Sequence, residues 1–163
     1  MTSKRRFAED TSVSVGKSQA EIKDMIQRYG CSHFAFMESD AGAQIAFRAK
    51  DRNVLFRLPL PDPAAPEFTV GYPPSGSRSY KVKLAPDQAR AKWEQACRRS
   101  WRALALVIKA KLEAVASGIV TFEDEFLAYT MKPDGETIGD WAKRELPGVL
   151  EGRPMPPLLP GPK

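Results

Sequence analysis

The chain has 163 residues, of which 42% are hydrophobic and 28% charged, enough for one domain with a core and too few for two. Its longest purely apolar run, Ala103 to Ile108, is too short for a membrane span, and no apolar segment behind the basic N-terminus marks a secretory signal. Cys31 and Cys97 fall in different predicted elements, which is typical of free thiols. We therefore expect a cytoplasmic protein.

The net charge of +5 is unevenly distributed. Residues 1–111 contain 20 Lys and Arg against 11 Asp and Glu, whereas residues 112–163 contain 5 against 9. Within Arg78–Lys111 there are ten bases and two acids, Asp87 and Glu94. A basic surface of this kind attracts polyanions, nucleic acid first, although a solvated helix face has the same composition.

The chain divides into a basic arm (1–12), a single α+β domain (13–150) and a proline-rich tail (151–163). Ser12–Val15 alternates in polarity and predicts a short strand. The Gly-Lys-Ser sequence at 16–18 lacks the upstream glycine of a phosphate-binding loop, because Thr11 occupies that position. Ser18 with Glu21 is a capping box for a helix that Gly30 ends.

Three strands are predicted next, separated by short turns: Ser32–Glu38, Ala43–Lys50 and Val54–Leu60. Apolar residues alternate along each strand, so we expect an antiparallel meander with one covered face. The inward side chains are predicted to be Phe34 and Phe36 on the first strand, Ala43, Ile45, Phe47 and Ala49 on the second, and Val54, Phe56, Leu58 and Leu60 on the third.

The proline-rich segment from Pro61 to Arg78 predicts no regular element, with a short strand in Ser79–Leu84. Phe68 and Tyr72 lie near bases, an arrangement that suits stacking on single-stranded nucleic acid. The alternative, which we favour from sequence, is that both aromatics pin the loop to the core.

The strongest pattern predicts a long helix from Pro86 to Gly118. One apolar stripe runs along it: Trp93, Cys97, Trp101, Leu104, Ile108, Leu112 and Val115. We expect Trp93, Trp101, Leu104 and Ile108 to cover the sheet. Arg98, Arg102 and Lys109, flanked by Lys92 and Arg99, are predicted to form a basic ridge on the opposite side.

Smaller elements are expected in the C-terminal part. Thr121 caps a helix with Phe122, Phe126 and Tyr129 on its apolar side, and a turn follows over residues 132–136. Thr137 caps a helix Ile138–Leu146 that buries Trp141 and Leu146 and that Pro147 and Gly148 end. The tail suits polyproline II, either as a ligand for an aromatic groove or, as we favour, wrapped on the protein's own surface.

Catalytic patterns are weak. His33 is the single histidine, and Cys97 lies on the apolar stripe, so a cysteine–histidine pair is not favoured. Acids in the C-terminal part would hold a divalent cation only if folding gathers them, and caps and turns explain several of them: Glu123, Asp124, Glu125, Asp134, Glu136 and Asp140. The sequence predicts no cofactor and no metal site.

The order of helix, three-stranded meander and long helix over residues 18–117 resembles the core of the single-strand annealing recombinases of phages. This resemblance of topology implies single-stranded DNA bound along a basic groove and assembly into homo-oligomeric rings. The segments WEQACRRSWRALALVIKAKLEAV and KPDGETIGDW also resemble uncharacterised small proteins encoded in phage and prophage genomes.

The first functional hypothesis is therefore non-enzymatic binding of nucleic acid, single-stranded DNA foremost, in phage or prophage DNA metabolism or recombination. Its predicted contact residues are Arg78, Tyr80, Lys81, Lys83, Arg98, Arg99, Arg102 and Lys109. A second hypothesis is a protein-interaction module that uses a free sheet edge or the tail on a host or phage partner, as an anti-defence or assembly factor. A third is a metal-dependent nuclease.

Overall fold

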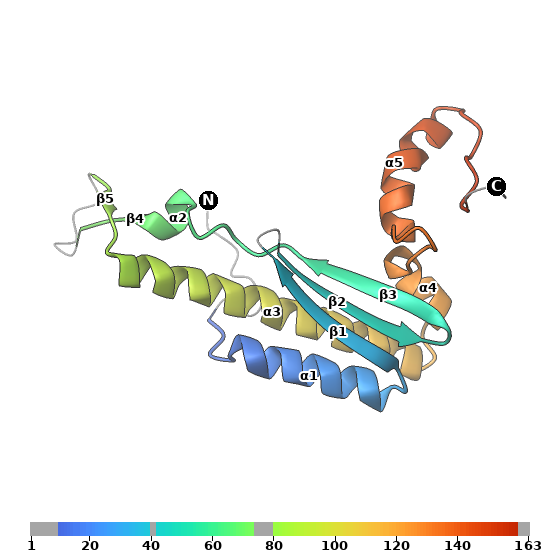
Figure 1. Cartoon of the computed structure of the whole chain (residues 1–163), viewed down its shortest axis with the longest axis horizontal. Coiled ribbons are helices and arrows are strands. Elements are labelled where there is room, and N and C mark those ends of the chain that lie inside the picture. The colour runs from blue at the N-terminus through green and yellow to red at the C-terminus, as the bar shows by residue number, and fades with distance from the viewer. Residues whose placement is uncertain (1–9, 40–41, 74–79, 160–163) are drawn as a thin grey trace.

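The computed structural model describes residues 10–39, 42–73 and 80–159 (Figure 1). Its main elements, in chain order, are α1 (Val15–Arg28), β1 (Ser32–Ser39), β2 (Gly42–Ala49), β3 (Arg52–Leu58), α2 (Pro66–Thr69), β4 (Val70–Gly71), β5 (Val82–Lys83), α3 (Pro86–Ala116), α4 (Phe122–Phe126) and α5 (Ile138–Leu150). A short 3-10 turn, Leu127–Tyr129, connects the last two helices. None of the helices in these ranges is long and apolar enough to cross a membrane.

The predicted antiparallel meander is confirmed. β1, β2 and β3 pair in that order, with Ile45 of β2 opposite Phe36 of β1 and Phe56 of β3. Alternation puts one side of β2 in the core, where Ala43, Ile45, Phe47 and Ala49 are all buried. β3 runs from Arg52 to Leu58, so it begins and ends two residues before the predicted Val54–Leu60. It ends earlier because Pro59 cannot donate a ladder hydrogen bond.

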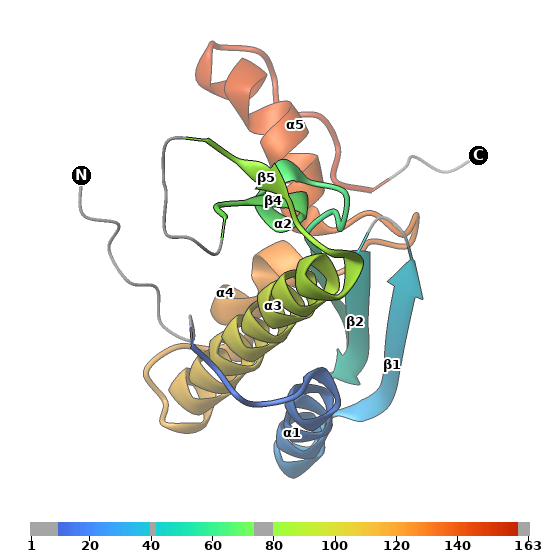
Figure 2. The ribbon, with the colours of Figure 1, turned by 90° about the vertical axis from the view of Figure 1, so that its left-hand side faces the viewer.

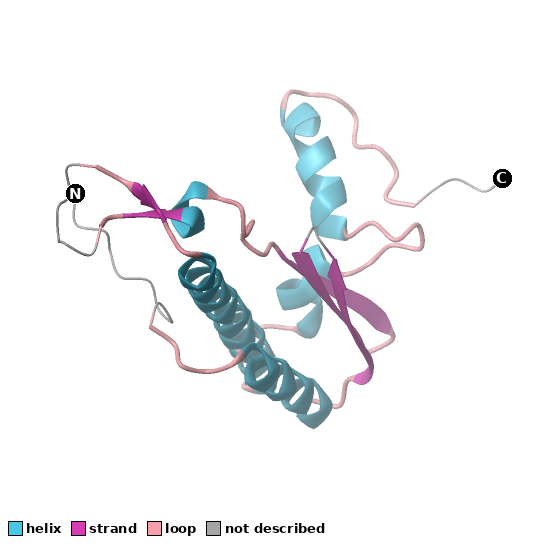
Figure 3. Cartoon of the chain, turned by 60° about the vertical axis from the view of Figure 1, so that its left-hand side comes forward, coloured by secondary structure: helices cyan, strands magenta, loops and turns pink. Residues whose placement is uncertain are grey.

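Two helices cover one face of this sheet. Figure 2 shows α1 and α3 side by side on one side of the strands, and Figure 3 shows the same layering from another angle. Trp101, Leu104 and Ile108 of α3 lie in the core with Ile22 and Ile26 of α1. The structure is thus the predicted α+β architecture with a long amphipathic helix across the sheet.

The prediction was wrong for Trp93. Its side chain is half-buried outside the core cluster, and its indole N–H donates to the carbonyl of Pro61 at 2.7 Å. The N-terminal part of α3 extends past the end of the sheet (Figure 1), and Trp93 is bonded to the chain that leaves β3 instead of covering the sheet.

The first helix begins a turn earlier than predicted. Ser14, not Ser18, is the N-cap, and its hydroxyl accepts from the Lys17 N–H at 3.2 Å. Residues 12–15 therefore form no strand. Ser18 is completely buried, because it lies one turn before Ile22 on the face that packs on the core. Gly30, at a φ of 75°, follows the end of the helix as expected.

The segment after β3 is more regular than its prolines suggested. Pro66 starts the short helix α2, in which Phe68 is buried, and β4 pairs with β5 in a small separate sheet. The predicted short strand within residues 79–84 is thereby confirmed as Val82–Lys83. This α2–β4–β5 region lies against the N-terminal part of α3, at one end of the molecule in Figure 3.

The C-terminal elements attach to the outer edge of β3. Thr130 bridges Val54, and the Met131 N–H donates to the Asn53 carbonyl at 2.8 Å. Aromatic rings join the two parts: Phe126 packs edge-on against Phe47 and Phe56, and Tyr129 stacks on Phe56. Thr121 and Thr137 cap α4 and α5 as predicted, each accepting from the N–H three residues on.

α5 continues through Pro147 to Leu150, so its predicted end at Leu146 was wrong. A proline removes one helical N–H, but the helix continues beyond Pro147 to Leu150, and Gly152, whose φ is 94°, follows the cap residue Glu151. Trp141 is buried as expected, whereas Leu146 is 42% exposed. The tail folds back through Arg153, whose N–H donates to Gly148, but Met155, Leu158 and Leu159 stay exposed.

The turn between β2 and β3 consists of two residues in an uncommon conformation. Lys50 and Asp51 have φ values of 46° and 61°, as a type I′ turn requires. Neither is glycine, and the ion pair from Arg48 to Asp51, at 3.2 Å, is exposed and supports the turn only weakly. The tight hairpin register therefore imposes left-handed backbone on residues that disfavour it.

Asp51→Gly is expected to raise the free energy of unfolding by about 0.5 kcal/mol, because glycine accepts the positive φ without a Cβ clash. Urea denaturation would show a higher midpoint at an unchanged slope. Asp51→Ala is the matched control, since it also removes the carboxylate but keeps Cβ. Equal stability of the two variants would contradict the backbone explanation.

A charged network holds the turn before α5. The Lys132 ammonium, on a side chain only 6% exposed, lies 2.8 Å from both Asp134 and Glu136, and Glu136 also pairs with Arg144 of α5. The bond from Lys132 lowers the pKa of Asp134, and the bond from Arg144 lowers the pKa of Glu136. The pKa of Asp140 is lowered mainly by a hydrogen bond from the Thr137 hydroxyl and to a smaller extent by Arg57 of β3.

These lowered pKa values make the C-terminal part sensitive to acid. Carboxyls with depressed pKa values stabilise the fold above the unfolded-state pKa, about 4, and this stability is lost as the pH falls through their lower folded-state values. Lys132→Met should therefore lower the Tm at pH 6, and the difference from the wild type should shrink towards zero in strong acid. Lys143→Met, at an exposed lysine near Asp140, is the control and should change the Tm little. A difference that does not vary with pH would contradict this assignment.

Candidate nucleic-acid interface

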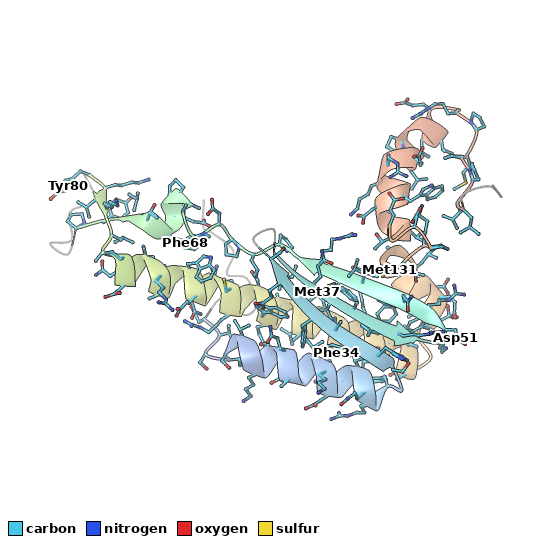
Figure 4. All side chains as sticks on the ribbon, in the orientation of Figure 1. Phe34, Met37, Asp51, Phe68, Tyr80 and Met131 are labelled. Carbon is cyan, nitrogen blue, oxygen red and sulfur yellow. The ribbon has the colours of Figure 1, made fainter. Side chains whose placement is uncertain are left out.

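Four side chains with nucleic-acid-binding chemistry are exposed on the β4–β5 hairpin. Tyr80 is 56% exposed and Tyr72 on the opposite arm is 52% exposed. The pairing of Val70 with Lys83 and Gly71 with Val82 runs on towards Tyr72 and Lys81. Lys81 and Lys83 are also exposed. Figure 4 shows Tyr80 at the extreme end of the molecule, far from α5.

The hairpin is anchored by apolar contacts at its base. Phe68 is 6% exposed, and the Leu84 N–H donates to the Thr69 carbonyl at 2.8 Å. Gly71 permits this packing, because a Cβ there would lie 2.6 Å from Leu84 Cδ2. The prediction that both aromatics anchor this segment to the core is therefore confirmed for Phe68 and wrong for Tyr72. The Tyr72 side chain is exposed and accessible to a ligand.

Among the described residues, no acidic side chain pairs with the hairpin lysines. In the described ranges no carboxylate lies within ion-pair distance of Lys81 or Lys83, although Arg90, a short way along α3, pairs with Glu94 at 2.9 Å. A lysine free of carboxylates keeps its full charge for a phosphate. Arg78, also predicted to contribute, lies outside the described residues.

The arginines in the middle of α3 are largely engaged within the protein. Arg98 donates twice to the Gln95 side-chain oxygen, at 2.9 and 2.6 Å, and Gln95 in turn donates to the Thr11 carbonyl. Arg99 is half-buried, and its Nε is enclosed without a hydrogen-bond partner in the described structure. Arg98 is therefore bonded within its own helix, and Arg99 is partly enclosed.

The prediction that Arg102 and Lys109 form a basic ridge on the side of α3 opposite the core was wrong. Both line a groove between α1 and α3, where Arg102 pairs with Glu21. Glu21 and Asp24 stand in this groove beside Arg28, so its charge is mixed. α1 packs along the side of α3 that carries these bases, and its acids lie beside them. The sequence of α3 alone could not predict this pairing.

The predicted contact residues therefore fall into separate groups. A helix rises about 1.5 Å per residue, which puts Arg102 about 24 Å and Lys109 about 35 Å along the axis from Pro86, where the hairpin joins α3. The hairpin bases thus do not lie beside Arg102 and Lys109. Of the predicted set, the described residues brought together are Tyr80, Lys81 and Lys83.

The acids considered for metal binding are dispersed among ion pairs and caps. Glu123 lies 3.8 Å from Arg52, Glu125 lies 2.7 Å from Lys111, and Asp140 pairs with Arg57. Across the described ranges, no three His, Cys, Asp or Glu side chains are grouped so that they could hold a metal ion. The geometry gives the nuclease hypothesis no support.

Cys97 and His33 also lie apart. His33 is exposed at the start of β1 and contacts the Ser32 hydroxyl at 3.0 Å, whereas Cys97 lines a cleft with Glu38 near the other end of that strand. Five strand residues span about 17 Å, so His33 is too far to activate the thiol. Burial, with Glu38 and Glu94 nearby, raises the pKa of Cys97, which keeps it protonated.

Sequence reasoning considered Tyr72 for stacking on nucleic acid but favoured an anchoring role, so Tyr72 was not among the predicted contact residues. The available signal was its position between glycine and proline in a segment with exposed bases, but the same pattern suited an anchoring role. The pairing of β4 with β5, which exposes Tyr72 on the same hairpin as Tyr80, involves two-residue strands that have no detectable period.

Comparison of the chain with models of known protein families, with curated proteins and with solved structures finds no match in any of the three. The geometry of the chain itself is therefore the basis for assigning a function.

Proposed function

We propose that this protein binds nucleic acid, single-stranded DNA foremost, and that the β4–β5 hairpin is the principal contact. The observation that carries the proposal is the pair of tyrosines, Tyr72 and Tyr80, each about half exposed, beside two lysines without acidic partners in the described structure. Unpaired bases stack on aromatic faces, and lysines neutralise the adjacent phosphates.

Single strands suit this site better than a duplex. Exposed tyrosine rings on a short hairpin offer stacking surfaces, which only unstacked bases can use. The hairpin also lies at one end of the molecule, where a single strand of nucleic acid can bind without contacting the β-sheet (Figure 4). A role in phage or prophage DNA metabolism or recombination, including strand annealing by an oligomer, belongs to the same proposal and rests on the resemblance of topology.

Fluorescence anisotropy with a labelled oligothymidine tests the proposal. We expect micromolar or tighter binding at low salt that weakens as salt rises, with a duplex of equal length binding less well. Tyr72→Ala combined with Tyr80→Ala should weaken binding at least about tenfold, because stacking on an aromatic contributes about 1–3 kcal/mol per base. An equivalent oligouridine distinguishes RNA from DNA. No binding at low salt would refute the proposal.

A pair of matched charge variants locates the site. Lys81→Gln with Lys83→Gln removes two charges from the hairpin, and Lys23→Gln with Lys109→Gln removes two from α1 and α3. The hairpin pair should weaken binding and lower the slope of log K against log salt by about 0.7 for each phosphate that the protein no longer neutralises. Equal effects from both pairs would indicate a response to net charge and would contradict the hairpin assignment.

A second candidate, a protein-interaction module, is favoured by a different observation. Apolar side chains stay exposed on α5 and along the tail: Leu146, Leu150, Met155, Leu158 and Leu159. Clustered exposed apolar residues are typical of protein contact sites. A pull-down that recovers one partner after nuclease treatment, and that Leu150→Asp with Leu159→Asp abolishes, would favour this function over the first.

A further inference from the structure

A groove crosses the molecule where the end of the sheet meets the N-terminal part of α3. It consists of two adjoining cavities of about 270 and 700 Å³ that share Glu38, Leu60 and Trp93 in their walls. The smaller cavity extends to Cys97 and Trp101 on α3, and the larger one extends along the Pro61–Pro63 segment. The groove therefore lies between the end of β1, the chain that leaves β3 and α3.

Its walls are apolar and well supported. The Trp93 indole is held by its bond to the Pro61 carbonyl, which also fixes the chain leaving β3. Pro59, Pro61 and Pro63 restrict the backbone of that wall, and Val15 at the start of α1 closes the smaller cavity. A groove between two regions, lined by aromatic and aliphatic side chains, is a usual location for a ligand.

The rim of the groove is acidic, although the chain as a whole is basic. Glu38 borders both cavities and Asp62 borders the larger one, while Glu94, which pairs with Arg90, borders the smaller one. Arg98 is the lining base, and its guanidinium bonds to Gln95 rather than to these carboxylates. Glu38 accepts a bond from the neutral Gln19 side chain and has no cationic partner in the described structure.

The carboxylates at the rim also affect the Cys97 thiol, which lies at the bottom of the smaller cavity. The Cys97 thiol has a raised pKa, first because it is buried and then because Glu38 and Glu94 oppose a negative charge at its position. The groove thus combines an apolar floor, which favours an aromatic or aliphatic side chain, with a negative rim, which favours a neighbouring cation.

We infer that this groove binds a peptide segment in which an aromatic or leucine side chain stands beside arginine or lysine. The apolar side chain occupies the space between Leu60 and Trp93, and the cationic side chain lies near Glu38 with Asp62 or Glu94 beyond it. An extended peptide fits better than a compact ligand, because the two cavities continue into one another. Charge complementarity also disfavours nucleic acid here, so the groove is a second site, distinct from the hairpin.

The three tryptophans provide the test. Trp93 and Trp101 border the groove, whereas Trp141 lies on α5 and serves as an internal reference. A capped synthetic peptide of sequence Lys-Phe-Arg-Leu-Lys is titrated into the full chain, and the indole N–H resonances are followed by nitrogen–proton correlation NMR. We expect saturable shifts of the Trp93 and Trp101 signals with the Trp141 signal unchanged.

Two control peptides and two variants make the result specific. Glu-Phe-Glu-Leu-Glu and Lys-Gly-Arg-Gly-Lys should each bind at least about tenfold more weakly, because each lacks one of the two complementary features. Glu38→Lys should weaken binding of the first peptide by a similar factor, whereas Glu151→Lys, the same charge change at an exposed site on the C-terminal side, should not. Absence of a saturable shift at millimolar peptide, or equal binding by both variants, would overturn the inference.

Discussion

The structure depends on one packing interaction, the contact of the apolar stripe of α3 with the inward face of β2 and β3. Trp101, Leu104 and Ile108 are at most 8% exposed, and each contributes about 2 kcal/mol or more on the basis of buried apolar area. α1 packs on the flank of the same helix, and Phe126 and Tyr129 close the sheet from the other end. Without this interaction, the inward face of the strands would be open to water.

A mismatch in length has the largest consequences for function. α3 has 31 residues and is about 46 Å long, whereas an eight-residue strand such as β2 spans about 27 Å. The sheet covers only part of the helix, and the remainder extends beyond it. The β4–β5 hairpin and the groove beside Trp93 both lie on this part of α3, which supports them as a rigid element. Side chains there are not needed to fill the core, so they stay accessible to ligands.

Tertiary pairing changes the meaning of the basic composition. The ten bases in Arg78–Lys111 suggest a continuous basic surface, but Arg102 pairs with Glu21 and Lys111 with Glu125, each from another helix. Such pairs remove isolated positive charge from the middle and the C-terminal end of α3. The charge that stays unpaired in the described structure includes the two lysines of the hairpin. Carboxylates from three segments line the groove, and one of them, Glu94, is paired with Arg90. The two proposed sites, the hairpin and the groove, therefore differ in the sign of their charge.

The sequence by itself determined the features that depend on local periodicity and capping. These are the two ends of α3, the alternation that buries Ile45 and Phe56, and the N-caps Thr121 and Thr137, because each is set by residues within a turn or two of one another. Tertiary structure chose between patterns that were locally equivalent. Both Ser14 and Ser18 suit an N-cap, and burial of Ser18 beside Ile22 settled the choice. The exposure of Tyr72, the displacement of Trp93 from the core and the neutralisation of Arg102 were likewise beyond the sequence, since each depends on a partner many residues away.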